Sequence, residues 1–328
     1  MAKNKFKSGL VIFIILIAIG VITGIVSVVK SSGTLDSSKI SVTFNSNSSS
    51  KSKGNSVCAI LISGIIQDAN NTYNQEWILN VVDKAKRNPR NKAIALFINT
   101  PGGAVYHADE LYLALQDYKT TGKKIYAYFG PMAASGGYYI ACAADKIYAN
   151  RNTLTGSIGV TMGQFYDFSE AMEKLGIKSV AIHSGRNKTM GTFTKPLTEE
   201  QKNIMQTLSD EAYEQFCSIV STQRHLKIER VHELADGRIY SAKQALENGL
   251  VDKVDSWENM INDLGMELDD PDINVIMNKY EKKQGFVNMM MGSASEYFEM
   301  EAAAKTGLPK KLIEEINREN LYPAYLYE

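Results

Sequence analysis

The stretch KIYAYFGPMAASGGYY, residues 124–139, decides the fold that we expect for this chain. Its first part, Lys124–Phe129, is almost wholly apolar, which predicts a strand buried in a sheet. Small residues then surround Ser135, and a helix is expected to start directly after it. Such small residues let the backbone turn sharply where a strand passes into a helix. The stretch therefore predicts that Ser135 occupies a strand-to-helix turn.

Strands and helices are expected to alternate on both sides of this turn. The expected strands cover residues 57–66, 92–99, 124–129, 147–149 and 179–183, and the expected helices cover residues 76–87, 107–118, 168–175 and 198–223. The last of these helices opens with a capping box formed by Thr198 and Gln201. A shorter helix is expected to end at Gly249, before a short strand. This alternation predicts an α/β fold with right-handed crossovers.

The N-terminal region has the pattern of a membrane anchor. Residues 8–29 contain no charged side chain and consist mainly of Ile, Val, Leu and Gly. A helix of that length, at about 1.5 Å per residue, spans a hydrocarbon core of roughly 30 Å. Three lysines precede the run and only Lys30 follows closely, which places the N-terminus in the cytoplasm. A cleavable signal peptide is the alternative, but no Ala-x-Ala-like site follows Val29.

Composition limits what the rest of the chain can be. Lys+Arg and Asp+Glu both total 36, so the net charge is zero and nothing indicates nucleic-acid binding. The three cysteines lie apart in apolar stretches, as buried free thiols do, and the four histidines lack the spacing of zinc ligands. We therefore expect no metal and no cofactor. The expected divisions are a cytoplasmic N-terminus and anchor at 1–30, a polar tether at 31–55, a folded domain at 56–267 and a C-terminal extension at 268–328.

Loops after the expected strands carry the residues that could do chemistry, because ligand crevices form at strand ends in open α/β sheets. In NTPGG, residues 99–103, Gly103 could aim a backbone N–H group at a developing oxyanion, and Gly136 could supply a second one. Lys188, if desolvated, could take the proton of the Ser135 hydroxyl, and Ser157 could aim that lysine. Taken alone, each glycine or serine motif also fits an ordinary turn, and the Lys188 motif also fits a solvated surface lysine.

Five motifs in this order resemble the signal peptide peptidase A family. They are NTPGG (99–103), MAASGGYY (132–139), TLTGSIGV (153–160), SGRNKTMG (184–191) and GRIYSAKQALENGLVD (237–252). Members are bacterial membrane-anchored Ser/Lys peptidases with a Clp/crotonase-like fold of repeated β-β-α units. The resemblance implies that Ser135 is the nucleophile, Lys188 the general base and Ser157 the residue that orients the lysine. It likewise implies that Gly103 and Gly136 form the oxyanion hole.

The resemblance also implies a function and a location. The chain is expected to be a single-pass protein of the cell membrane whose extracytoplasmic domain degrades remnant signal peptides and other apolar peptides, as a homo-oligomeric ring. The family has a double-length form in which serine and lysine come from different halves. This chain has one copy of each motif, so it resembles the short form, with a complete dyad expected in each subunit. Asn187 departs from the family, which often has an aromatic or charged residue before the lysine.

Three other functions are weighed against this one. A Clp-like Ser-His-Asp protease would need a histidine soon after the serine, but the first histidine after Ser135 is His183. A catalytically inactive membrane-tethered scaffold would not need both Ser135 and Lys188. A crotonase-type acyl-CoA enzyme would need a cytoplasmic pool of CoA, which the expected topology denies it.

The C-terminal tail leaves two interpretations open. Residues 321–327, LYPAYLY, are apolar and aromatic, and an exposed apolar end is costly unless it docks somewhere. The tail could enter a peptide-binding cleft as an added strand, in its own subunit or in a neighbour. Alternatively, its tyrosines could pack on the domain surface or at the membrane interface.

Overall fold

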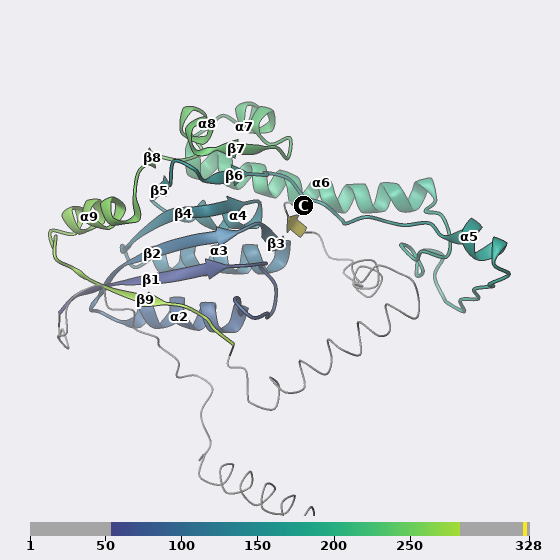
Figure 1. Ribbon diagram of the computed structural model, residues 1–328, viewed down its shortest axis with the longest axis horizontal. Coiled ribbons are helices and arrows are strands. Elements are labelled where there is room, and N and C mark those ends of the chain that lie inside the picture. The colour runs from purple at the N-terminus through teal and green to yellow at the C-terminus, as the bar shows by residue number, and fades with distance from the viewer. Residues whose placement is uncertain (1–53, 283–323, 327–328) are drawn as a thin grey trace, which may run out of the picture. The chain divides into compact units, whose positions relative to one another are not determined.

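The computed structural model describes residues 54–282 and 324–326, and these form a mixed α/β fold around a central sheet (Figure 1). The predicted α/β class is therefore confirmed. The apolar run at 8–29, most of the tether and most of the C-terminal extension lie outside the described residues. Within the described ranges, no helix is both long enough and apolar enough to cross a membrane.

The central sheet has eight strands in the part of the chain described, and its main path runs β7-β6-β4-β2-β1-β9. Strands β1, β2, β4 and β9 are parallel, and β7 at one edge is antiparallel to β6. The strands are β1 (Ser56–Ser63), β2 (Asn91–Thr100), β4 (Lys124–Ala134), β5 (Lys146–Ala149), β6 (Leu154–Gly156), β7 (Ile239–Ser241), β8 (Lys253–Val254) and β9 (Asn274–Asn278). Two further strands, β3 (Gly102–Ala104) and β10 (Ala324–Leu326), form a separate pair.

Strand β4 shows why the sheet is buried on both faces. Alternate side chains of a strand point to opposite faces. Ile125 and Phe129 belong to the large hydrophobic cluster on the face covered by α2 (Gln75–Arg87), α3 (Val105–Lys119) and α4 (Gly136–Ala141). Tyr126 and Tyr128 belong to a second cluster, with Met260 of α9 (Trp257–Glu267), on the opposite face.

Helix α6 (Glu199–Arg224) is joined to the core by its second half. The predicted capping box is present, because the Thr198 hydroxyl accepts from the Gln201 N–H and the Gln201 side chain accepts from the Thr198 N–H. Phe216 and Val220 are fully buried, whereas in the first half of the helix only Met205 is buried. The remaining helices are α5 (Ser169–Lys174), α7 (Ile228–Leu234) and α8 (Ala242–Glu247).

Two sequence predictions need correction or extension. The strand predicted at 179–183 is wrong: those residues are exposed and pair with no described strand. Val180 is 85% exposed and Ile182 is 99% exposed. Strand β9 lies beyond the predicted domain boundary at 267/268, yet its pairing with β1 makes it part of the same sheet.

Candidate active site

Ser135 occupies a strained turn between β4 and α4, as the sequence predicted. Its φ is 53° and its ψ is −119°, a conformation that side-chain-bearing residues rarely adopt. The side chain is fully buried, and the Ser135 N–H donates to the Gly156 carbonyl at 2.8 Å. The Ser135 Oγ has no hydrogen-bond partner among the described residues. A buried hydroxyl without a partner is uncommon, and a strained turn is where serine hydrolases place their nucleophile.

The second glycine after Ser135, Gly137, is required sterically. Gly136 is buried and starts α4. A Cβ on Gly137 would lie 2.6 Å from Thr100 Cγ2, so a side chain at 137 would push β2 away from the nucleophile turn. The backbone of α4 can therefore approach the strand end that leads to Gly103.

Gly103 lies in β3, and one edge of this strand is hydrogen-bonded to Ile66. The Ala104 N–H donates to the Ile66 carbonyl at 2.9 Å, and the Ile66 N–H donates to the Gly102 carbonyl at 2.9 Å. A Cβ on Gly103 would lie 1.9 Å from the Ile66 oxygen, so only glycine fits there. Because peptide groups alternate in direction along a strand, the N–H and C=O of Gly103 face away from Ile66. They are available to a chain on the other side.

Strand β10, from the C-terminal tail, lies on that other side. It runs antiparallel to β3, with Tyr325 opposite Gly103 and Leu326 opposite Gly102 (Figure 1). Cα atoms of β10 also come within 8 Å of those of α4. Of the two interpretations of the tail, the structure thus favours docking as an added strand, beside the loop that carries Ser135.

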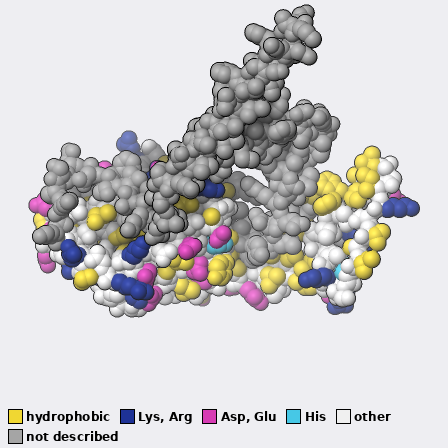
Figure 2. All heavy atoms as spheres, turned by 90° about the horizontal axis from the view of Figure 1, so that it is seen from below, with side chains coloured by type: hydrophobic (Ala, Val, Ile, Leu, Met, Phe, Trp, Pro, Cys, Tyr) yellow, Lys and Arg dark blue, Asp and Glu magenta, His cyan; other side chains and the backbone are white. Residues whose placement is uncertain are grey.

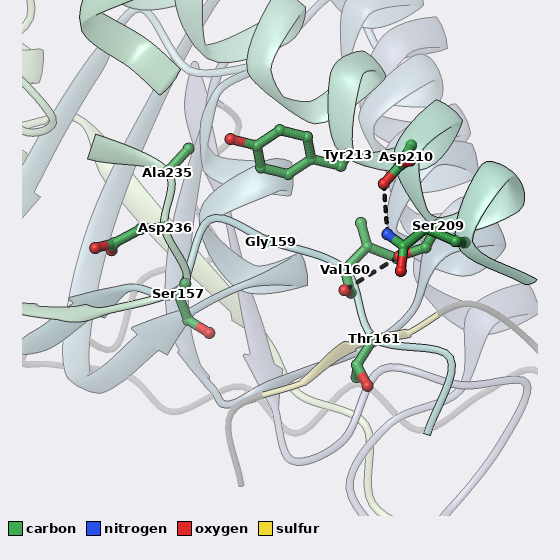
Figure 3. Close-up of a pocket in the computed structure, with 11 residues that line it drawn as sticks. Ser157, Gly159, Val160, Thr161, Ser209, Asp210, Tyr213, Ala235 and Asp236 are labelled. Carbon is green, nitrogen blue, oxygen red and sulfur yellow. Dashed lines mark hydrogen bonds between the residues drawn. The ribbon is translucent and has the colours of Figure 1, made fainter. Parts of the chain in front are cut away.

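Ser157 is close to Ser135, because Ser135 is bonded to Gly156. Its φ is 49°, it is only 6% exposed, and its N–H donates to the Arg238 carbonyl at 2.8 Å. Ser157 lines a pocket of about 430 Å³ between its own loop, α6 and the turn before β7. Figure 3 shows Tyr213 and Asp236 around the same pocket.

Lys188 is not joined to these groups. It is exposed, in a segment, residues 161–198, that contains no buried residue. Its N–H donates to the Gly185 carbonyl at 3.1 Å, but no hydrogen bond or ion pair of its side chain occurs in the part of the chain that the structure describes. The structure therefore brings Ser135, Gly136 and Ser157 together beside the Gly103 strand. It does not bring Lys188 to them, so the complete dyad expected in each subunit is not seen among the described residues.

Two threonines position the loops and were missed by the sequence analysis. The Thr100 hydroxyl accepts from the Gly102 N–H at 3.0 Å and donates to the Gly64 carbonyl at 2.5 Å, which fixes the turn before Gly103. The Thr155 hydroxyl donates to the Ala133 carbonyl at 2.6 Å, which ties β6 to the strand before Ser135. Both threonines lie inside motifs quoted above. A threonine at the end of a strand was the sequence signal that could have identified them.

The cysteines are poor alternatives as nucleophiles. Burial raises the pKa of the Cys58 and Cys142 thiols to about 12 and the pKa of Cys217 to about 11. The thiolate, which is the reactive form, is therefore scarce at neutral pH. In the described ranges, no three His, Cys, Asp or Glu side chains are grouped as metal ligands.

Comparison with known proteins gives consistent matches. Residues 117–269, which contain Ser135, Ser157 and Lys188, match the model of peptidase family S49. A protein of Enterococcus faecium that carries the name signal peptide peptidase SppA is 34% identical over 244 residues, covering 72% of this chain and 70% of that protein. A protease of Synechocystis is 41% identical over 167 residues, covering 51% of this chain and 60% of that protein.

Two further matches are looser. Protease 4 of Haemophilus influenzae is 31% identical over 211 residues, which are 63% of this chain but only 34% of that longer protein. The solved structure of a membrane-bound stomatin-specific protease aligns with a TM-score of 0.40 and 16% identity, over 63% of this chain and 84% of that one. A likeness that low does not bear on the fold.

Proposed function

Because this chain belongs to peptidase family S49 and is a serine-type peptidase, we propose that it cleaves remnant signal peptides and other apolar peptides, with Ser135 as its nucleophile. The observation that carries the proposal is the Ser135 turn: a buried, strained serine whose Oγ has no hydrogen-bond partner in the described part of the chain. The Gly103 strand beside it presents backbone groups that can pair with an extended chain, as β10 does in this structure. The name of the Enterococcus relative supports the class of substrate.

In the proposed mechanism, the peptide lies antiparallel to β3, where β10 lies in this structure. The Ser135 Oγ attacks the scissile carbonyl carbon, and Lys188 takes the hydroxyl proton as general base. The N–H groups of Gly103 and Gly136 stabilise the oxyanion of the tetrahedral intermediate. Lys188 then gives the proton to the leaving amine, and a water molecule hydrolyses the acyl-enzyme by the reverse route.

We infer that a second copy of the chain supplies Lys188. Support comes from the segment 161–198, which exposes several large apolar side chains, among them Leu175 at 74% and Ile182 at 99%. Figure 2 shows hydrophobic side chains on the surface on the side where α5 lies in Figure 1. Such a surface is costly in water unless a partner covers it. The pocket beside Ser157 is open to receive a side chain from that partner.

The wider arrangement follows from the same proposal. Copies would assemble into a closed ring, held by the segment 161–198 of each neighbour. The fold would be of the Clp/crotonase-like type, which the parallel strands with helical crossovers support. Residues 8–29 would anchor each copy in the cell membrane, with the peptidase domain outside the cytoplasm.

A fluorophosphonate probe tests the nucleophile. The full chain in detergent should be labelled at Ser135, as mapped by mass spectrometry of the labelled peptide, and should hydrolyse a synthetic signal peptide. Ser135→Ala should do neither. Labelling at another serine, or unchanged hydrolysis by Ser135→Ala, would overturn the assignment. A chain that is never labelled would instead support the inactive scaffold.

A further inference from the structure

A buried tyrosine one helical turn after Ser135 joins three helices. The Tyr139 N–H donates to the Ser135 carbonyl at 2.9 Å, so the backbone of Tyr139 is bonded directly to that of Ser135. Its side chain is fully buried. The Tyr139 hydroxyl donates to Asp109 Oδ1 at 2.6 Å and accepts from Gln215 Nε2 at 2.7 Å. Asp109 lies on α3 and Gln215 on α6.

Each of these two helices directly follows a segment that holds another part of the proposed site. Helix α3 starts directly after β3, the strand of Gly103. Helix α6 follows directly after the segment that carries Lys188. Gln215 Nε2 also donates to Asp109 Oδ1 at 3.2 Å, which closes the three groups into one network. The Tyr139 hydroxyl thus connects α4 to α3, which follows the Gly103 strand, and to α6, which follows the segment with Lys188.

Most other buried tyrosines do not have this arrangement. Buried tyrosine hydroxyls generally find a partner, so a hydrogen bond alone means little. The Tyr138 hydroxyl donates to the Leu250 carbonyl, and the Tyr118 hydroxyl donates to Asn91 Oδ1 at 2.6 Å, at the far end of α3. Neither touches both α3 and α6.

The nucleophile turn needs such a support. A positive φ at a residue other than glycine is unfavourable and persists only where the surroundings enforce it. Helix α4 has six residues, too few to be stable without tertiary packing. The Tyr139 ring also packs edge-on against Tyr112 of α3 and tilted against Phe216 of α6.

We propose that Tyr139 is a positioning residue: through Asp109 and Gln215, its hydroxyl fixes Ser135 relative to the Gly103 strand and to α6. The proposal rests on the proposed role of Ser135 as nucleophile. The described partners of the Tyr139 side chain belong to α3 and α6, so it acts through Ser135 rather than on the peptide itself. Its loss should therefore slow the attack of Ser135 without weakening the binding of the peptide.

Tyr139→Phe in the full chain tests this, because it removes only the hydroxyl. The rate of fluorophosphonate labelling and kcat should both fall about 10- to 100-fold, as displacements near a reacting group do, while KM stays within a factor of about two. The pH profile should keep its shape, because no proton passes through the tyrosine. Tyr118→Phe is the matched control: it removes another buried hydroxyl, and should keep the labelling rate of the unmodified chain.

If Tyr139→Phe fails to fold, Gln215→Leu provides a second test. Gln215 is exposed, so its substitution should not prevent folding. It should lower kcat in the same selective way, and combining it with Tyr139→Phe should add less than the product of the two losses. Equal labelling rates for Tyr139→Phe and Tyr118→Phe, or a change confined to KM, would overturn the positioning role. Labelling that persists in Ser135→Ala would instead overturn the proposed function.

Discussion

Ser135 and Ser157 show how much of the site depends on local backbone strain. In the described ranges, four residues other than glycine have a positive φ: Ser135, Ser157, His225 and Asp269. Two of these are the serines that the motifs singled out. The other two follow helices, where a left-handed residue is ordinary. Ser135 follows β4 and Ser157 follows β6, and these two strands pair with each other. Backbone strain at both positions is typical of a functional site and not of ordinary surface turns.

Ser157→Ala should separate catalysis from binding. If the Ser157 hydroxyl aims the base, kcat should fall about 10- to 100-fold with KM little changed, because the peptide itself binds along β3. Steady-state kinetics on a synthetic signal peptide measure both values. Ser241→Ala is a suitable control, since it removes a helix-capping hydroxyl outside the site. Unchanged kinetics for Ser157→Ala would leave Ser157 as a turn residue only.

At the scale of elements, the attachment of α9 should depend on pH. Hydrogen bonds from Tyr126, Lys124 and Lys146 lower the pKa of Glu267 to about 2, with that of Tyr126 the largest effect. A carboxyl whose pKa is lowered by folding stabilises the folded state above its usual pKa. That contribution is lost as pH falls through the lowered value.

Glu267→Gln should therefore lower the free energy of unfolding at pH 7 by about 1 kcal/mol, a modest amount because the group is partly exposed. It should also flatten the loss of stability between roughly pH 5 and pH 2. Urea unfolding across that range measures both effects. A variant whose stability falls with acid as steeply as that of the unmodified chain would show that Glu267 does not control this transition.

The position of β10 predicts that the tail competes with substrate. Removing the residues after Asn320 should raise the activity on short peptides several-fold, because β3 becomes free. The tail should be trimmed in the unmodified chain but stay intact in Ser135→Ala, as intact mass shows. Equal activity with and without the tail, and no serine-dependent trimming, would leave the strand pairing without a functional role.

Sequence patterns predicted the elements that a short apolar run determines and missed those that need a distant partner. Strands β1, β2 and β4 and helices α2, α3 and α6 were expected close to their observed bounds. The strand at 179–183 failed because an apolar run becomes a strand only where another edge accepts its hydrogen bonds. Strand β9 was missed for the converse reason, since its partner is β1 at the other end of the domain.

The same limit applies to the site. Ser135, Ser157, Gly103 and Gly136 are local features of motifs, and the structure places them near one another. Asp109, Tyr139 and Gln215 come from three helices, so no spacing in the sequence indicates that they meet. The motif of Lys188 likewise does not show that this lysine is exposed. A motif identifies a residue, but it does not indicate which copy of the chain has the active site that the residue enters.

For the whole molecule, we propose that one copy provides Ser135 and another provides Lys188. Two observations support this: the buried Ser135 Oγ has no hydrogen-bond partner among the described residues, and Lys188 lies on a segment in which no residue is buried. Lys188→Arg is the sharper variant of the lysine, because a guanidinium keeps a cation of similar length but cannot act as a base. Each of the full chains Ser135→Ala and Lys188→Arg should be inactive alone.

Co-expression of these two variants, with different affinity tags, tests the central claim most directly. Assemblies purified through both tags should hydrolyse a synthetic signal peptide, because some sites combine an intact Ser135 with an intact Lys188 from the neighbouring copy. Fluorophosphonate should label only the Lys188→Arg chain, which keeps its serine. Assemblies that contain both chains and yet show neither hydrolysis nor labelling would contradict a site shared between copies.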